Sequence, residues 1–151
     1  MSGVKTIVKP TEALVDERVH VQLQGLPQKI PVTIKASFQE ERLRFCSYGC
    51  FIPTQGGQVM VERQAPAQGM YTGFEPMGLF WSMRPETFQG QNIRLLKRSV
   101  TKPIVVKLAV FEGYLSWDEL FDTPTKPLAI SKVYRWYKYK CSKRKSERRK
   151  Y

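Results

Sequence analysis

The chain has 151 residues, 42% of them hydrophobic and 25% charged, which suits one domain with its own core and excludes global disorder. No run of 18 apolar residues occurs, which excludes a transmembrane helix. The net charge of +12 is uneven, because residues 135–151 hold nine Lys or Arg and a single acid. We therefore expect a mildly basic domain with a strongly basic tail.

The first ten residues, MSGVKTIVKP, lack the apolar core of a secretory signal. We take residues 1–10 as an N-terminal leader. The three cysteines are an odd number, which favours free thiols in a reducing compartment. The expected location is therefore the cytoplasm, and no membrane association is expected.

Alternation of apolar and polar residues predicts a series of short β-strands. Pro- and Gly-containing turns separate them, as in an antiparallel sandwich of about seven strands. The predicted strands cover residues 19–23, 32–38, 43–51, 58–62, 104–111 and 128–137. A single short helix is expected at SWDELF, residues 116–121, where Ser116 and Glu119 have the spacing of a capping box.

The chain has one histidine, His20, and alternation in its strand places it on the polar, solvent-facing side. Without a second imidazole or a nucleophile elbow, a Ser-His-Asp or Cys-His-Asp site is not expected. Cys46 and Cys50 have a metal-like spacing but no second pair follows, so two thiols on one strand face are the favoured interpretation. We expect no catalytic residue, no cofactor and no metal.

The segment GFEPMGLFWSMRPE, residues 73–86, concentrates large apolar side chains between two prolines. Such a density cannot remain exposed to water in a monomer. The favoured interpretation is a loop that plugs the core or a strand that crosses between the two sheets, with Trp81 as the central filler. The alternative is an apolar surface for another domain or a ligand, formed by Phe74, Met77, Leu79 and Phe80.

Three stretches resemble one family, the type I acyl-CoA thioesterases with the bile acid-CoA:amino acid N-acyltransferase. They are ALVDE at 13–17 with the following VHV and GLP, the block at 73–86, and RLLKR at 94–98 before Pro103. The resemblance covers about residues 11–137 and implies an immunoglobulin-like sandwich, the N-terminal domain of those enzymes. In the family an α/β-hydrolase domain with the Ser or Cys nucleophile, Asp and His follows; here the basic tail 138–151 stands in its place.

The resemblance implies an accessory role in the hydrolysis of acyl-CoA to fatty acid and CoA, or in acyl transfer to glycine or taurine. The expected partner is an α/β-hydrolase domain of the same family, with acyl-CoA bound only by the complete enzyme. Alone, the chain is expected to be inactive. Family members differ in targeting, some being peroxisomal or mitochondrial, and no such signal is seen here.

A second hypothesis is binding of nucleic acid or another polyanion by the tail. Two basic triplets, 143–145 and 148–150, follow the aromatic residues Tyr134, Trp136, Tyr137 and Tyr139, which could stack on bases. Basic runs are more often solvated tails, so specific nucleic-acid binding is the less favoured hypothesis.

Overall fold

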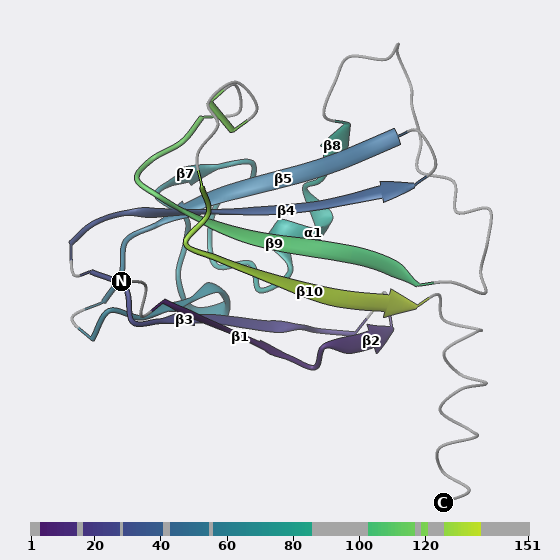
Figure 1. Cartoon of the computed structure of the whole chain (residues 1–151), viewed down its shortest axis with the longest axis horizontal. Helices are drawn as coiled ribbons and strands as arrows, with labels where there is room; N and C mark the ends of the chain where they lie inside the picture. The colour runs from purple at the N-terminus through teal and green to yellow at the C-terminus, as the bar shows by residue number, and fades with distance from the viewer. Residues whose placement is uncertain are drawn as a thin grey trace, which may run out of the picture.

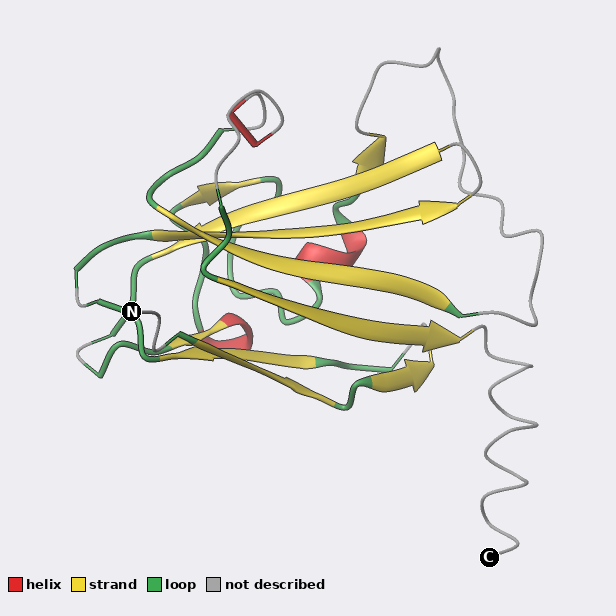
Figure 2. Ribbon diagram, in the orientation of Figure 1, coloured by secondary structure: helices red, strands yellow, loops and turns green. Residues whose placement is uncertain are grey.

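In the computed structural model, most of the described chain lies in β-strands arranged as two facing layers (Figure 2). The structure describes residues 4–14, 17–27, 29–40, 43–54, 56–85, 103–116, 119–120 and 126–136. This arrangement confirms the predicted all-β sandwich. Among these residues, no helix has the length and apolar content needed to cross a membrane.

The smaller sheet has three strands in the order β1-β3-β6 (Figure 1). They are β1 (Lys5–Lys9), β3 (His20–Gln24) and β6 (Val59–Met60). The predicted leader is corrected here, because β1 pairs along its length with β3 and belongs to the sheet. The strand expected at 58–62 is also shorter, because Val61–Arg63 turn into a 3-10 helix, η1.

The larger sheet has the order β2-β10-β9-β4-β5-β7, and β8 pairs with β5 as well. Its strands are β2 (Glu12–Leu14), β4 (Val32–Glu40), β5 (Leu43–Phe51), β7 (Gln68–Gly69), β8 (Arg84–Pro85), β9 (Ile104–Glu112) and β10 (Ala129–Trp136). The predicted bounds of β5 are met at both ends. The β2–β10 pairing is parallel, whereas the other pairings of this sheet are antiparallel.

The core lies between the two layers and takes alternate residues from each strand. Leu23 from β3 faces Ile34, Phe51 and Leu108 from the larger sheet, and all four are fully buried. The rings of Phe38 and Phe45, neighbours on β4 and β5, stack with centroids 5.3 Å apart. Continuous apolar faces of this kind supply most of the stability of a sandwich.

The predicted capping box forms. The backbone N–H of Glu119 donates to the Ser116 hydroxyl, and the backbone N–H of Ser116 donates to the Glu119 carboxylate, both at 3.3 Å. Glu119 and Leu120 are helical; the other residues of the predicted helix after Ser116 lie outside the described residues.

Candidate functional site: the aromatic loop

The aromatic loop, defined here as residues 73–83, contains the one-turn helix α1 (Gly78–Trp81). Figure 1 shows α1 close to β4 and β5, on the side of the larger sheet that faces the smaller one. Three of its side chains, Met77, Leu79 and Phe80, belong to the buried core cluster and are at most 8% exposed. The loop therefore plugs the core, as the favoured interpretation of the sequence predicted.

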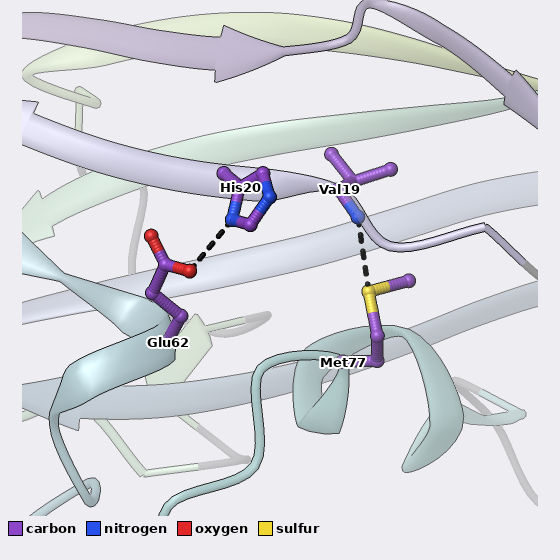
Figure 3. Close-up of polar contacts among 4 residues, drawn as sticks. All are labelled: Val19, His20, Glu62 and Met77. Atoms are coloured by element: carbon purple, nitrogen blue, oxygen red, sulfur yellow. Dashed lines mark hydrogen bonds and ion pairs between the residues drawn. The ribbon is translucent and has the colours of Figure 1, made fainter.

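Two hydrogen bonds tie the loop to both sheets. The backbone N–H of Val19, just before β3, donates to the Sδ atom of Met77 at 3.3 Å (Figure 3). On the other side, the hydroxyl of Ser47 on β5 donates to the backbone carbonyl of Leu79. Both bonds are buried, so each satisfies a polar group that water cannot reach. The position of the loop is consequently fixed from two directions.

A buried arginine makes the third contact that fixes the loop. The guanidinium carbon of Arg135 on β10 lies 4.9 Å from the centroid of the Phe80 ring, and Arg135 is only 7% exposed. A cation over an aromatic face at this distance is stabilised by the ring quadrupole, more strongly where water is excluded. β10 is thus coupled to the loop through one charged side chain.

Tyr71 explains why a glycine occupies position 78. A Cβ atom built at Gly78 would overlap the ring of Tyr71, three atoms of which would lie within 2.7 Å of it. The hydroxyl of Tyr71 is buried without a hydrogen-bond partner among the described residues. Burial raises the pKa of Tyr71, and the nearby charge of Glu75 raises it further, so this side chain stays neutral at physiological pH.

Phe74 and Trp81 project from the loop, each 70% exposed. The expectation that Trp81 fills the core is wrong: one helical turn points Leu79 and Phe80 inward and leaves Trp81 outside. Of the four residues predicted to form a docking surface, Phe74 alone is exposed. Met77, Leu79 and Phe80 support it from within, and the docking role itself stays a prediction.

The remaining candidate residues lie apart from the loop and from each other. His20 is half-exposed, and its Nδ1 atom lies 2.6 Å from a carboxylate oxygen of Glu62 on η1 (Figure 3). Cys46 and Cys50 are buried and form no disulfide with each other. Alternation places them on the opposite face of β5 from the core residues Phe45 and Phe51. The prediction of two thiols on one strand face is confirmed.

Thr33 closes the space around Cys50. Its hydroxyl lies 3.1 Å from the Cys50 sulfur and donates to the carbonyl of Gly113 at 2.7 Å. It also accepts the backbone N–H of Leu115 at 3.1 Å. These bonds hold the loop after β9 over the outer face of the sheet, so the thiol is shielded by a structural network. No three metal-ligating side chains gather anywhere in the described part of the chain.

Residues 16–148 match the family described as acyl-CoA thioester hydrolase/BAAT N-terminal region. The chain belongs to this family, as its resemblance predicted. The match continues past residue 137, into the range assigned to the basic tail.

The sequence is 35% identical over 135 residues to a mouse (Mus musculus) bile acid-CoA:amino acid N-acyltransferase, covering 88% of this chain and 31% of that protein. It is 35% identical over 100 residues to human (Homo sapiens) acyl-coenzyme A thioesterase 1, covering 66% of this chain and 23% of that protein. It is 37% identical over 100 residues to the rat (Rattus norvegicus) mitochondrial acyl-coenzyme A thioesterase 2, covering 66% of this chain and 21% of that protein. The chain therefore spans a third or less of these relatives' length.

Proposed function

We propose that the sandwich is an accessory domain for acyl-CoA thioester chemistry, which docks against an α/β-hydrolase domain of its family. The observation that carries the proposal is the exposure of Phe74 and Trp81 on a loop whose interior side is fixed by Met77, Leu79 and Phe80. Large aromatic side chains presented on a rigid support are typical anchors of protein interfaces. The names of the relatives, thioesterases and an N-acyltransferase, supply the chemistry.

The positions of the reactive groups support a role without catalysis for this sandwich. Acyl transfer through a covalent intermediate needs a nucleophile within hydrogen-bond reach of its base. His20 lies on the smaller sheet and is paired with Glu62. Cys46 and Cys50 lie on the larger sheet, on the face turned away from the core. The thickness of the sandwich therefore separates the described thiols from the imidazole.

The first experiment measures release of CoA from a long-chain acyl-CoA by the purified chain. Loss of thioester absorbance is the better readout, because a thiol reagent would also respond to the protein's three cysteines. We expect no release above the uncatalysed rate. Turnover above that rate would overturn the accessory role, and its loss in His20→Gln or in variants without Cys46 and Cys50 would show which described groups carry it.

The second experiment measures binding of a separately produced hydrolase domain from a family member. Phe74→Asp and Trp81→Asp should each weaken that binding by about tenfold or more, because a charge replaces a desolvated anchor. Ile130→Asp is the matched control, since Ile130 is 51% exposed but lies on β10, away from the loop. Equal losses in all three variants would contradict a docking role for the loop.

We further propose a cytoplasmic location, supported by the odd number of cysteines, which favours free thiols in a reducing compartment. Localisation of a C-terminally tagged chain by fluorescence tests this directly. Accumulation in an organelle or in the medium would contradict it.

The tail offers a second candidate function, binding of a nucleic acid or other polyanion. Residues 138–151 lie outside the described residues, so the support is their sequence alone, with two basic triplets. Binding through the tail should disappear when residues 138–151 are deleted and should fall steeply with salt. Binding that persists after the deletion would assign it to the sandwich.

A further inference from the structure

The outer face of the larger sheet carries exposed apolar side chains beside exposed lysines. Ile130 and Tyr134 on β10 and Val105 on β9 are 51%, 38% and 38% exposed. Lys132 lies between Ile130 and Tyr134 along β10, on the same face of the strand. Lys107 on β9 is its direct neighbour across the pairing, and both lysines are exposed. We call these five residues the outer patch.

The strand register brings these side chains together. β9 and β10 run side by side in the sheet (Figure 1), with Tyr134 opposite Val105 and Lys132 opposite Lys107. Residues directly opposite each other in an antiparallel pair have Cβ atoms about 5 Å apart. Val106, which separates Val105 from Lys107 along β9, belongs to the core. Alternation therefore turns the outer patch away from the core.

The charges on this face favour an acidic partner. In the described parts of β4, β5, β9 and β10, no outward position holds Asp or Glu. The same positions hold four cations, which are Lys35, Arg44, Lys107 and Lys132. Like charges directly opposite each other destabilise a sheet, as Lys107 and Lys132 do here. A carboxylate placed between the two ammonium groups would offset that repulsion.

Charge and chemistry together decide which occupant fits the outer patch. A second copy of this face would set lysines against lysines. Residues 138–151 hold eight Lys or Arg and one acid, so the basic tail is repelled for the same reason. A nucleic acid offers phosphates to the lysines, but the aliphatic Val105 and Ile130 are not stacking partners for its bases. A protein segment with acidic and apolar side chains matches both parts of the patch.

We propose that the outer patch binds an acidic amphipathic helix of a partner protein. Ile130, Lys132 and Tyr134 follow one another along β10 at about 6.6 Å, two residues of a strand. Residues i, i+4 and i+8 of an α-helix follow one another at about 6 Å along one face. A helix lying along β10 with apolar, acidic and apolar residues at these positions therefore meets a complementary side chain at each. The proposal does not depend on docking by the aromatic loop.

The test measures binding of a fluorescein-labelled helical peptide to the full chain by fluorescence anisotropy. The peptide has about 20 residues, enough for a stable Ala-rich helix, and carries leucine, glutamate and leucine at successive four-residue spacings. In the control peptide the glutamate is moved by two residues, which places it on the opposite side of the helix. We expect saturable binding of the first peptide, about fivefold tighter than binding of the control. Equal affinities would overturn the proposal.

Lys107→Glu separates the outer patch from the basic tail and has opposite effects on folding and binding. Glutamate opposite Lys132 replaces a like-charge pair with an opposite-charge pair, so the variant should unfold at the same temperature as the parent or higher. Peptide binding should nevertheless weaken about tenfold or more. Lys5→Glu is the matched control, the same charge reversal at an exposed residue of β1 in the other sheet, and should leave the affinity within about twofold. Equal losses in the two variants would place the peptide on the tail and overturn the proposal.

Ile130→Asp separates the outer patch from the aromatic loop. It should weaken peptide binding about tenfold or more, because a carboxylate replaces an apolar contact and repels the acidic helix. Its binding of the hydrolase domain should stay that of the parent, so each docking surface can fail without the other. If Ile130→Asp binds the peptide like the parent, the apolar part of the patch has no role and the proposal is wrong.

A single-stranded oligonucleotide replaces the peptide in the last arm of the experiment. We expect Lys107→Glu and Lys5→Glu to change its affinity equally, because the tail attracts phosphates without using the outer patch. If Lys107→Glu selectively weakens binding of the oligonucleotide but not of the peptide, the patch is a nucleic-acid surface and the proposal is wrong.

Discussion

Leu79→Ala tests whether the aromatic loop is part of the core. Leu79 is fully buried, with 0% of its surface exposed, and its backbone carbonyl is held by Ser47, so the surrounding structure cannot collapse freely into the space. Truncation of such a leucine removes its transfer free energy and leaves a cavity, which together cost about 3 kcal/mol. For a chain of this size that loss corresponds to roughly 10 °C in Tm.

Urea unfolding followed by far-ultraviolet circular dichroism measures this loss directly. Trp81→Ala is the matched comparison, because it removes a larger apolar side chain from the same turn of α1. With 70% of its surface exposed, Trp81 should contribute less than about 0.5 kcal/mol to the free energy of unfolding. The reasoning fails if Trp81→Ala destabilises the chain more than Leu79→Ala does.

Three further predictions concern the supports of the loop. Gly78→Ala should lower the free energy of unfolding by about 1–3 kcal/mol, because the added methyl group forces Tyr71 aside. The control is Gly56→Ala, whose new Cβ meets no atom within 4 Å and which should unfold in urea like the parent. If the two variants unfold at the same urea concentration, the close contact between Gly78 and Tyr71 is contradicted. Ser47→Ala should lower the free energy of unfolding measured in urea by about 1–3 kcal/mol, because it leaves the buried carbonyl of Leu79 unpaired. A smaller loss would show that water replaces the hydroxyl. Because the pKa of Tyr71 is raised in the folded chain, only the unfolded chain ionises this side chain just above its ordinary pKa of 10.0. The free energy of unfolding should therefore fall as pH rises beyond that value. Tyr71→Phe should show a shallower fall with pH, and an unchanged dependence on pH would refute the role of Tyr71.

Alternation in the sequence was sufficient to predict the long strands. In β5 the inner residues Phe45 and Phe51 alternate with outward Cys46 and Cys50 over the whole strand, so the bounds could be placed without the structure. β1 could not be recognised in this way, because KTIVK is short and its apolar residues are consecutive. Its assignment depends on pairing with β3, which is a tertiary contact that no local pattern records.

The candidate site was only partly predictable for a related reason. Hydrophobic density identified the loop, but α1 has four residues, and a single turn gives no repeat from which an inner face could be predicted. Trp81 was therefore placed inside and lies outside. Ser47 did leave a signal, since it is the polar residue on the otherwise apolar face of β5, although its partner, the Leu79 carbonyl, could come only from the structure.

The parallel pairing of β2 with β10 has a consequence for how the protein is made. Glu12 and Tyr134 are far apart in the sequence and are neighbours in one sheet, so this contact closes nearly the whole domain into a single loop. Pairings between such distant residues form late and slow folding. During synthesis, the sheet can be completed only after Trp136 has left the ribosome. Until then Phe80 lacks the arginine that covers it, and the incomplete sheet leaves apolar surface open to contact with other chains.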